Sequence, residues 1–598
     1  MSERPATTEK ALGAIPSAAQ SALPRAPTAE AIDLAFQAAL GKLTGGLSTA
    51  AMTSAWAEWA KQFGTSPAAQ AALASEGMRR ASDLFDFSVR AAGSTKLSPT
   101  EGAGTDADAR FSADAWSQYP FNVWARGFQH ATAWLGSLPR AVDGVSGKNL
   151  ELVDFTIRQW LEALSPTNSL ATNPELIELT RQEGGENLRR GARNLLEDIA
   201  RVARKEGPAG TEDFVVGKAV AATPGRVIYR NDLIELLQYS PTREQVHAEP
   251  VLIVPAWIMK YYILDLSARN SLVKYLVDQG HTVFMISWKN PVAEDRDFGM
   301  DDYLDLGPLK ALEVVNAVVP QRKVHATGYC IGGTLLSIAA ARLAQLGDQR
   351  LASVTLFAAQ TDFSEPGELS LFINESQLAL LKAQMHQEGV LDSKQMGGAF
   401  QMLRPRDLIW QPMVQSYLKG QRDPMIDMMA WNADGTRMPY RMHTEYLYRL
   451  YLDNELSTGR FPVHGTPVRL SDIEVPMFVV GTETDHVAPW KSVCKVGKLV
   501  STVDYTFLLT SGGHNAGIVS GAVHPKRRHR IMTRTSEASS GSVSGWFAKT
   551  PPTPGSWWPV WQAWLAAHSS GLESAPSMGA MDQGYPPLEA APGEYVRG

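Results

Sequence analysis

One stretch, residues 323–342, constrains the fold more than any other part of the chain. Val324–Tyr329 has the apolar character of a short buried strand, and the Ala/Leu-rich segment Leu335–Leu346 has helical spacing. Between them lies Gly328-Tyr-Cys330-Ile-Gly332, a G-x-C-x-G with the spacing of a nucleophile elbow. In that turn the nucleophile stands at a sharp strand-to-helix corner, and the glycines let strand and helix pass closely. The motif is weak evidence by itself, but together with apolar strands that alternate with helices and with an acid and a base at later strand ends, it predicts an α/β-hydrolase fold.

The elbow normally presents serine, whereas this chain presents Cys330. A helix that begins at the nucleophile places backbone N–H groups and a positive dipole end beside it, which favours the thiolate form. The alternative is a buried structural cysteine that happens to precede a glycine-rich helix start. Sequence position alone leaves both open.

Length and composition limit the remaining possibilities. A chain of 598 residues is several times the usual domain size, and 44% hydrophobic with 20% charged residues describes a globular protein. The net charge of −6 gives no reason to expect a nucleic-acid partner. The cysteines are Cys330 and Cys494, too few for a disulfide framework and typical of a reducing cytoplasm. No signal peptide or membrane-span pattern appears, so a cytoplasmic protein without a membrane span is expected.

The first third of the chain reads as helical. Residues 1–28 are rich in Ala, Pro, Ser and Thr without an apolar period, which predicts a disordered tail. Residues 29–212 carry helical spacing of apolar and aromatic side chains, and Asn173-Pro174 supplies a stop and cap. The aromatic residues can form a core or an exposed adhesive face, and we expect assembly and surface attachment from this domain instead of chemistry.

From residue 213 the pattern changes to apolar strands alternating with helices, which predicts a parallel sheet covered on both faces. We expect a catalytic domain over 213–550, interrupted at about 362–470 by a mostly helical, methionine-rich cap insertion. Residues 551–598 form a Trp-rich, then Pro/Gly-rich C-terminal segment. The expected strands begin near Phe214 and then cover these segments: 226–230, 250–255, 281–288, 324–328, 353–358, 476–481 and 505–510.

Two later strand ends supply partners for Cys330. Asp485 follows the strand that ends at Gly481, and His514 follows the strand that ends at Thr510. The order nucleophile, acid, base is that of hydrolase-fold enzymes, and carboxyl ends of parallel strands meet on one rim. His486 is a competing base, but it adjoins the acid directly, so we favour His514.

Beyond this triad, the chain resembles the polyhydroxyalkanoate synthases, specifically the long single-subunit type (class I-like) that makes poly(3-hydroxybutyrate)-like polyesters. The resemblance spans roughly 108–598 and is carried by these motifs, among others: Asp108-Ala-Arg-Phe, Ser165-Pro-Thr-Asn, Lys260-Tyr-Tyr-Ile-Leu-Asp265-Leu, Gly328-Tyr-Cys-Ile-Gly-Gly-Thr, Asp485-His-Val-Ala-Pro-Trp and Ala591-Pro-Gly-Glu-Tyr-Val. Ala256, Met259 and Asn515 depart from residues common in the family, which bears on substrate preference.

The resemblance implies an acyltransferase that polymerises 3-hydroxyacyl-CoA, most simply (R)-3-hydroxybutyryl-CoA, through a Cys330 thioester. Its expected partners are the CoA substrate, the growing polyester chain, the granule surface and a second copy in a homodimer. No cofactor or metal is expected, because the CoA thioester is a substrate. The Ile331 N–H and an amide after Val254 would bind the oxyanion. Asp265 matches a position of functional importance in the family; alternatively, it caps the helix that begins at 271.

Two other functions fit the same residues. A cysteine-dependent hydrolase, such as a thioesterase or polyester depolymerase, would use the same triad with water as acceptor. A granule-surface binding protein with vestigial catalytic residues is the third possibility, although Cys330, Asp485 and His514 are all present.

Overall fold

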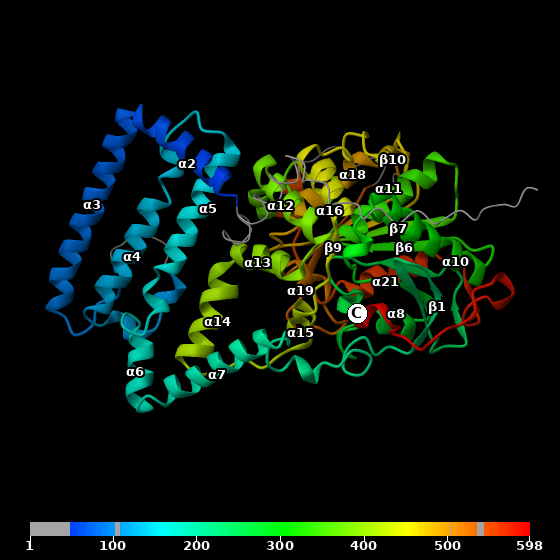
Figure 1. Ribbon diagram of the computed structural model, residues 1–598, viewed down its shortest axis with the longest axis horizontal. Helices are drawn as coiled ribbons and strands as arrows, with labels where there is room; N and C mark the ends of the chain where they lie inside the picture. Colours follow the sequence, from blue (N-terminus) through cyan, green and yellow to red (C-terminus); the bar gives the residue numbers. More distant parts are fainter. Residues whose placement is uncertain (1–47, 102–107, 503, 535–542) are drawn as a thin grey trace, which may run out of the picture.

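The computed structural model describes residues 48–101, 108–502, 504–534 and 543–598. It has a helical N-terminal part and a larger α/β part, and helix α7 runs between them (Figure 1). The expected disordered tail, 1–28, lies outside the described residues. Within the described ranges, no helix combines the length and apolarity needed to cross a bilayer.

The N-terminal part contains these helices: α2 (Thr49–Gly64), α3 (Pro67–Ala92), α4 (Phe121–Leu135), α5 (Gly147–Ala163), α6 (Pro174–Gln182) and α7 (Glu186–Ala203). Its core is aromatic, because Trp116, Phe111 and Phe128 pack edge to face and are almost fully buried. Asn173 caps α6 by accepting from the N–H groups of Glu175 and Leu176, as the Asn-Pro pair predicted. The predicted helical character of this region is confirmed.

A ten-stranded sheet organises the α/β part, in the order β1-β2-β5-β4-β6-β7-β12-β13-β14-β15. Its strands are β1 (Gly225–Arg230), β2 (Ile234–Tyr239), β4 (Val251–Val254), β5 (Val283–Trp288), β6 (Val324–Tyr329), β7 (Leu351–Phe357), β12 (Met477–Thr482), β13 (Tyr505–Thr510), β14 (Arg528–Arg534) and β15 (Thr553–Pro554). The six strands from β5 to β13 in this order run parallel, while β1–β2 and β14–β15 are antiparallel additions at the two edges. Short two-stranded pairs lie outside it: β3 (Gln245–His247) with β16 (Leu572–Ser574), β8 (Val390–Leu391) with β9 (Met438–Pro439), and β10 (Pro462–Val463) with β11 (Thr466–Pro467).

The expected strand at Phe214 is wrong. Residues 214–216 form no ladder beyond one isolated bridge between Val216 and Val220, and the sheet begins at Gly225. Strands β2 and β14 were not predicted. β2 contains Glu235 and Gln238, and β14 reads as a basic stretch, so neither shows the apolar run that marks the central strands.

Helices cover both faces of the sheet: α8 (Leu272–Asp278), α9 (Met300–Leu304), α10 (Lys310–Val318), α11 (Ile331–Gln345), α17 (Trp490–Cys494), α18 (Val496–Leu499), α19 (His514–Ile518), α20 (Val543–Lys549) and α21 (Trp558–Ala567). The C-terminal tryptophans are core residues. Trp557, Trp558 and Trp561 are buried, and their indole N–H groups donate to Gly517 O, Ile518 O and Thr355 Oγ1. Helix α21 therefore covers one face of the sheet and contacts β7 and α19.

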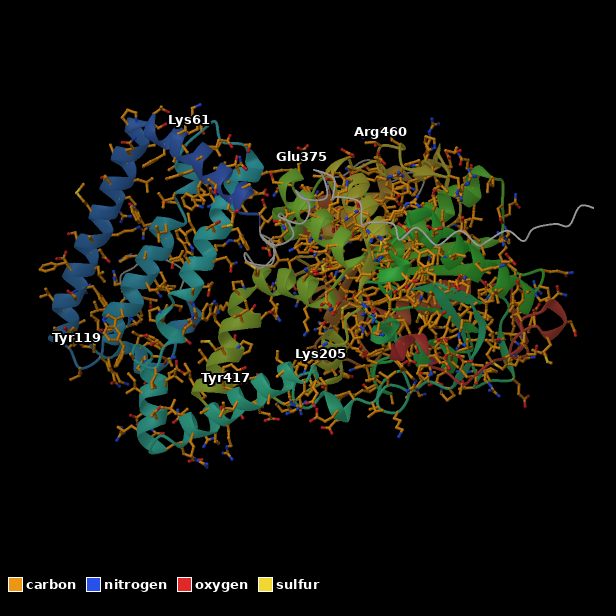
Figure 2. The ribbon with its side chains drawn as sticks, viewed as in Figure 1. Lys61, Tyr119, Lys205, Glu375, Tyr417 and Arg460 are labelled. Atoms are coloured by element: carbon orange, nitrogen blue, oxygen red, sulfur yellow. The ribbon has the colours of Figure 1, made fainter. Side chains whose placement is uncertain are left out.

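The cap insertion, 362–470, is mostly helical as expected, with α12 (Glu375–Glu388), α13 (Ser393–Leu403), α14 (Gln411–Met413), α15 (Asp427–Ala433) and α16 (Tyr440–Tyr446), and with π-helical turns such as η11 (Val414–Leu418) and η12 (Leu447–Leu452). Helix α7 packs on this insertion at η11, beside Tyr417 (Figure 2). Only glycine fits there, because a Cβ at Gly191 would lie 1.9 Å from Tyr417 O. The N-terminal part thus contacts the cap insertion directly.

Candidate active site

Cys330 stands at the corner between β6 and α11, in the strained backbone conformation of a nucleophile elbow, with φ 53° and ψ −127°. Close packing explains how the strain is held. A Cβ on Gly328 would lie 2.3 Å from the Cα of Gly333, and one on Gly332 would lie 2.4 Å from the carbonyl oxygens of Val254 and Pro255. Strand, helix and the loop after β4 meet with no space for larger side chains.

Asp485, the predicted acid, follows β12. Its Oδ1 accepts from the backbone N–H groups of Val487 and Ala488, and its Oδ2 accepts from Thr482 Oγ1 at 2.8 Å. The second hydrogen-bond partner of Oδ2 is His514 Nδ1, also at 2.8 Å. Burial raises the pKa of Asp485, but His514 and these hydrogen bonds outweigh burial and lower that pKa overall. The carboxylate is therefore ionised and fixed in orientation.

His514 begins α19 directly after β13 and lies between Asp485 and Cys330. With Nδ1 bonded to Asp485, the other ring nitrogen is left for the sulfur, and Cys330 is near enough to raise the pKa of His514. Burial lowers the pKa of His514, yet the negative charges of Asp485 and Cys330 outweigh it and hold that pKa well above its ordinary value. The arrangement therefore stabilises the protonated form of His514.

His486, the competing base, does not take this place. Its ring Nδ1 is buried without a hydrogen-bond partner among the residues that the structure describes, and burial together with Arg404 lowers its pKa. The structure thus brings together Cys330, Asp485 and His514, and leaves His486 outside the hydrogen-bonded series.

Two backbone amides, those of Ile331 and Ala256, are the candidates for binding an oxyanion. Ile331 is the first residue of α11. The N–H groups of Gly333 and Thr334 donate to the Cys330 carbonyl, so the N–H of Ile331 is not used for that hydrogen bond. Gly332 holds the loop after β4 against the same helix start. Pro255 has no N–H, so Ala256 carries the first amide of that loop.

Two tyrosines that sequence reasoning missed, Tyr446 and Tyr451, lie near Cys330. Burial raises the pKa values of Tyr446 and Tyr451, and the nearby charge of Cys330 raises them further. The Tyr446 ring lies 5.5 Å from that of Tyr451 and 6.5 Å from that of Trp257. Both tyrosines come from the methionine-rich cap insertion. The methionines Met385, Met438 and Met442 are buried core residues of that insertion. No sequence motif distinguishes these tyrosines from other aromatic residues of the cap.

Asp265 lies away from the hydrogen bonds of the triad. It is buried, and its Oδ1 accepts from Thr223 at 2.5 Å and from Ser271 at 2.6 Å. Ser271, not Asp265, caps α8, because its side chain accepts from the Lys274 N–H. Asp265 orients that capping hydroxyl by accepting its hydrogen bond. Burial raises the pKa of Asp265. Its described contacts are structural.

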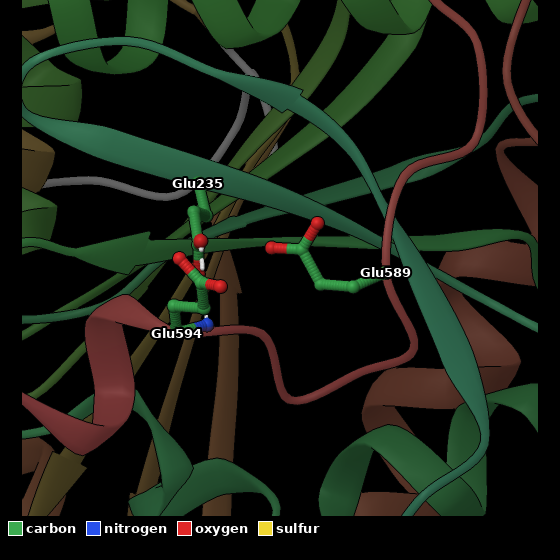
Figure 3. Close-up of side chains that lie close together, drawn as sticks. All are labelled: Glu235, Glu589 and Glu594. Atoms are coloured by element: carbon green, nitrogen blue, oxygen red, sulfur yellow. Dashed lines mark hydrogen bonds between the residues drawn. The ribbon is translucent and has the colours of Figure 1, made fainter.

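One group of side chains has the spacing of a metal site within the described ranges: Glu235, Glu589 and Glu594 (Figure 3). It lies at the β1–β2 edge and not at the triad. Arg230 pairs with all three carboxylates, at 2.5 Å from Glu235, and so supplies the positive charge itself. An acidic cluster that an arginine already neutralises gives no reason to assign an ion.

Comparison with known proteins agrees with this architecture. Residues 107–276 match the family model of the poly-beta-hydroxybutyrate polymerase (PhaC) N-terminus, residues 27–68 match a second N-terminal model of poly-beta-hydroxybutyrate polymerase, and residues 249–520 match the alpha/beta hydrolase fold. The chain is 39% identical over 500 residues to a poly(3-hydroxyalkanoate) polymerase of Methylorubrum extorquens, covering 82% of this chain and 80% of the relative. It is 38% identical over 504 residues to the PhaC polymerase subunit of Cupriavidus necator, covering 83% and 84%. The chain belongs to the poly(3-hydroxyalkanoate) polymerase family, and is an acyltransferase-type enzyme built on an α/β-hydrolase fold.

Proposed function

We propose that this enzyme polymerises 3-hydroxyacyl-CoA, with (R)-3-hydroxybutyryl-CoA as the simplest substrate, through a covalent thioester on Cys330. One observation carries the proposal above the others: a thiol at a strained elbow lies against an imidazole that a buried carboxylate orients at 2.8 Å. The names of the relatives support the polyester product.

In the acylation step, His514 accepts the proton of the Cys330 thiol and the sulfur attacks the thioester carbonyl of the substrate. The resulting oxyanion is bound by the Ile331 N–H and the Ala256 N–H. When the carbonyl re-forms, the C–S bond to CoA breaks and His514 returns its proton to the CoA sulfur. One thioester replaces another, so the acyl group stays activated, which a serine ester would not achieve as well.

In the extension step, the 3-hydroxyl of an incoming 3-hydroxyacyl-CoA attacks the Cys330 thioester. His514, held by Asp485, accepts the hydroxyl proton and passes it to the departing sulfur of Cys330. An ester bond forms and the chain now ends in the incoming CoA thioester. A second thioester exchange returns the lengthened chain to Cys330 and releases CoA, so each cycle adds one unit.

The cap insertion supports an apolar acyl site at the sulfur. Buried Trp257 of the loop after β4 and, from the cap, buried Tyr446 and partly buried Tyr451 form an aromatic group, which suits a short acyl chain and excludes water from the thioester. Exclusion of water also favours transfer to a hydroxyl over hydrolysis.

We further propose that the N-terminal helical part serves dimerisation and attachment to the polyester granule, and that the enzyme acts in the cytoplasm at the granule surface. Apolar side chains on the outer faces of α3 and α7 support a role in association: Met78, Phe85, Val89, Leu196, Ile199 and Val202. The described N-terminal helices contain no nucleophile–base–acid arrangement.

The deciding assay incubates purified enzyme with 3-hydroxybutyryl-CoA and follows both free thiol and insoluble material. Thiol release with polymer is the expected result. Continued thiol release with a water-soluble hydroxy acid as sole product would instead identify a hydrolase, and no thiol release would identify a binding protein.

A further inference from the structure

The loop after β4, residues 255–260, is held along its whole length by parts of the chain far away in sequence. Trp288 Nε1 donates to Pro255 O at 2.9 Å at the start of the loop. In the middle, Thr436 of the cap insertion donates to Trp257 O, and Met259 forms a β-bridge with Gly435. At the end, the indole N–H of Trp431 donates to Lys260 O at 2.7 Å. The loop that presents the Ala256 amide is therefore fixed by the cap insertion.

Lys260 extends this anchoring to the C-terminal residues. Its side chain is 4% exposed, a rare placement for lysine. The ammonium donates to Gly598 O at 2.6 Å and to Tyr595 O at 3.4 Å. Asn290 also donates to Gly598 O, at 3.0 Å. A buried ammonium is costly without such acceptors, so this lysine requires residues 595–598 in place.

Residues 588–598, here called the C-terminal strap, are in turn fixed on the sheet. The strap pairs with β1, since Leu588 N donates to Val227 O and Val227 N donates to Glu589 O. The buried carboxylate of Glu235 then accepts from the N–H groups of Glu594 and Tyr595, at 3.0 and 3.1 Å (Figure 3). The strap is therefore fixed on β1 and β2 before its last residues reach Lys260.

We propose that Lys260 is a positioning residue that couples the C-terminal strap to the oxyanion-binding loop, so that the Ala256 amide is aligned only while the strap is seated. This proposal rests on the proposed function. Its physical basis is that the amide must point at the position of the oxyanion within a narrow tolerance, and the loop has no regular secondary structure to set that direction.

Two reactions of Cys330 separate loop alignment from general damage. Alkylation by iodoacetamide occurs at a saturated carbon and forms no oxyanion, so it reports the thiolate alone. Acylation by 3-hydroxybutyryl-CoA in a single turnover needs both the thiolate and the aligned amides. Both rates are measured in a Cys494→Ser background. Lys260→Met is compared with Lys274→Met, which removes an exposed lysine paired with Asp278.

For Lys260→Met we expect acylation to slow by about 10- to 100-fold, while alkylation stays within about twofold of the parent. Lys274→Met should leave both rates unchanged. If Lys260→Met fails to fold, deletion of residues 595–598 tests the same coupling, because water can then hydrate the exposed ammonium. The selective loss of acylation should recur in that deletion variant, with alkylation again within about twofold of the parent.

Equal acylation rates in the parent and in a folded Lys260 variant would overturn the proposal. A parallel fall of both rates would also overturn it, since the lysine would then act on the thiol or on the whole fold. Failure of the proposed function is distinct: the parent enzyme itself would then transfer no acyl group to Cys330.

Discussion

The Tyr329 hydroxyl donates a 2.5 Å hydrogen bond to the side-chain oxygen of Asn515, joining the residue before the nucleophile to the residue after the base. The Tyr329 ring also lies 5.6 Å from the His514 ring. This pair links β6 to the start of α19. The Tyr329–Asn515 hydrogen bond, together with the sheet, therefore fixes the distance between Cys330 and His514.

Asn515→Ile should lower the free energy of unfolding by about 1–3 kcal/mol, because it leaves the buried Tyr329 hydroxyl without an acceptor. Adding Tyr329→Phe to that variant should restore most of the loss, since the unpaired hydroxyl is then gone. Urea denaturation of the parent, both single variants and the double variant measures the coupling. Additive losses would show that the two side chains are energetically independent.

Cys330→Ala should abolish CoA release, because no other group can hold the growing chain. The matched control is Cys494→Ser: burial raises the pKa of the Cys494 thiol to about 11, so it is an unreactive core residue. Polymer formation by the alanine variant above a small fraction of the parent rate would disprove the assignment, as would a comparable loss in Cys494→Ser.

Asp485→Asn should still acquire an acyl group from 3-hydroxybutyryl-CoA but extend it poorly. A thiol beside an imidazole and a helix N-terminus needs little further help to ionise, whereas a 3-hydroxyl is a far weaker acid. His514→Gln should impair both steps. Rapid-quench release of CoA with mass analysis of the Cys330 peptide separates them, and a folded Asp485→Asn enzyme that never acylates would contradict this division.

Stability should fall in acid because of buried neutral histidines at the amino ends of the central strands. Burial lowers the pKa of His281 to about 3 and that of His325 to about 4, from ordinary values of 6.5. The unfolded chain binds these protons first, so their contribution is complete above pH 6.5 and is lost as pH falls toward the folded-state values. For His281 the loss between pH 7 and pH 5 is about 2 kcal/mol.

His281→Phe tests this, because both ring nitrogens of His281 lack partners among the described residues and its ring stacks on His247 at 4.3 Å. The free energy of unfolding of the variant should decline less steeply than that of the parent between pH 7 and pH 5. Identical slopes would exclude His281 as a source of the acid sensitivity.

Deletion of residues 1–28 should leave polymer synthesis and assembly nearly unchanged, whereas deletion to about residue 210 should reduce dimerisation and granule association. The longer deletion also uncovers η11 by removing α7, so aggregation is measured alongside by light scattering. A soluble long deletion that stays dimeric and granule-bound would refute the assembly role.

The sequence predicted the structure best where a local pattern of side chains is typical of one backbone conformation. The G-x-C-x-G lies between an apolar strand and a helix, and Asp485 and His514 follow later apolar strands, so the elbow, the central sheet and the triad order were predictable from these patterns together. Strand β2 was missed because its polar residues Glu235 and Gln238 are buried by partners over three hundred residues later in the chain. Tyr446 and Lys260 acquire their places through such long-range contacts, which no local pattern encodes.

The two edges of the ten-stranded sheet are protected in different ways. Residues 588–591 cover β1. The opposite edge ends in β15, a two-residue strand that contains Pro554 and pairs with Arg528 and His529 of β14, while Arg530 and Arg534 add positive charge to the rest of β14. An uncovered strand edge is a template for pairing with another chain. If many copies of this enzyme gather on one polyester particle, as we propose, their sheets meet at high local concentration. One covered edge and one short, proline-containing and charged edge then keep crowded neighbours from joining edge to edge, leaving contact between copies to the helical part.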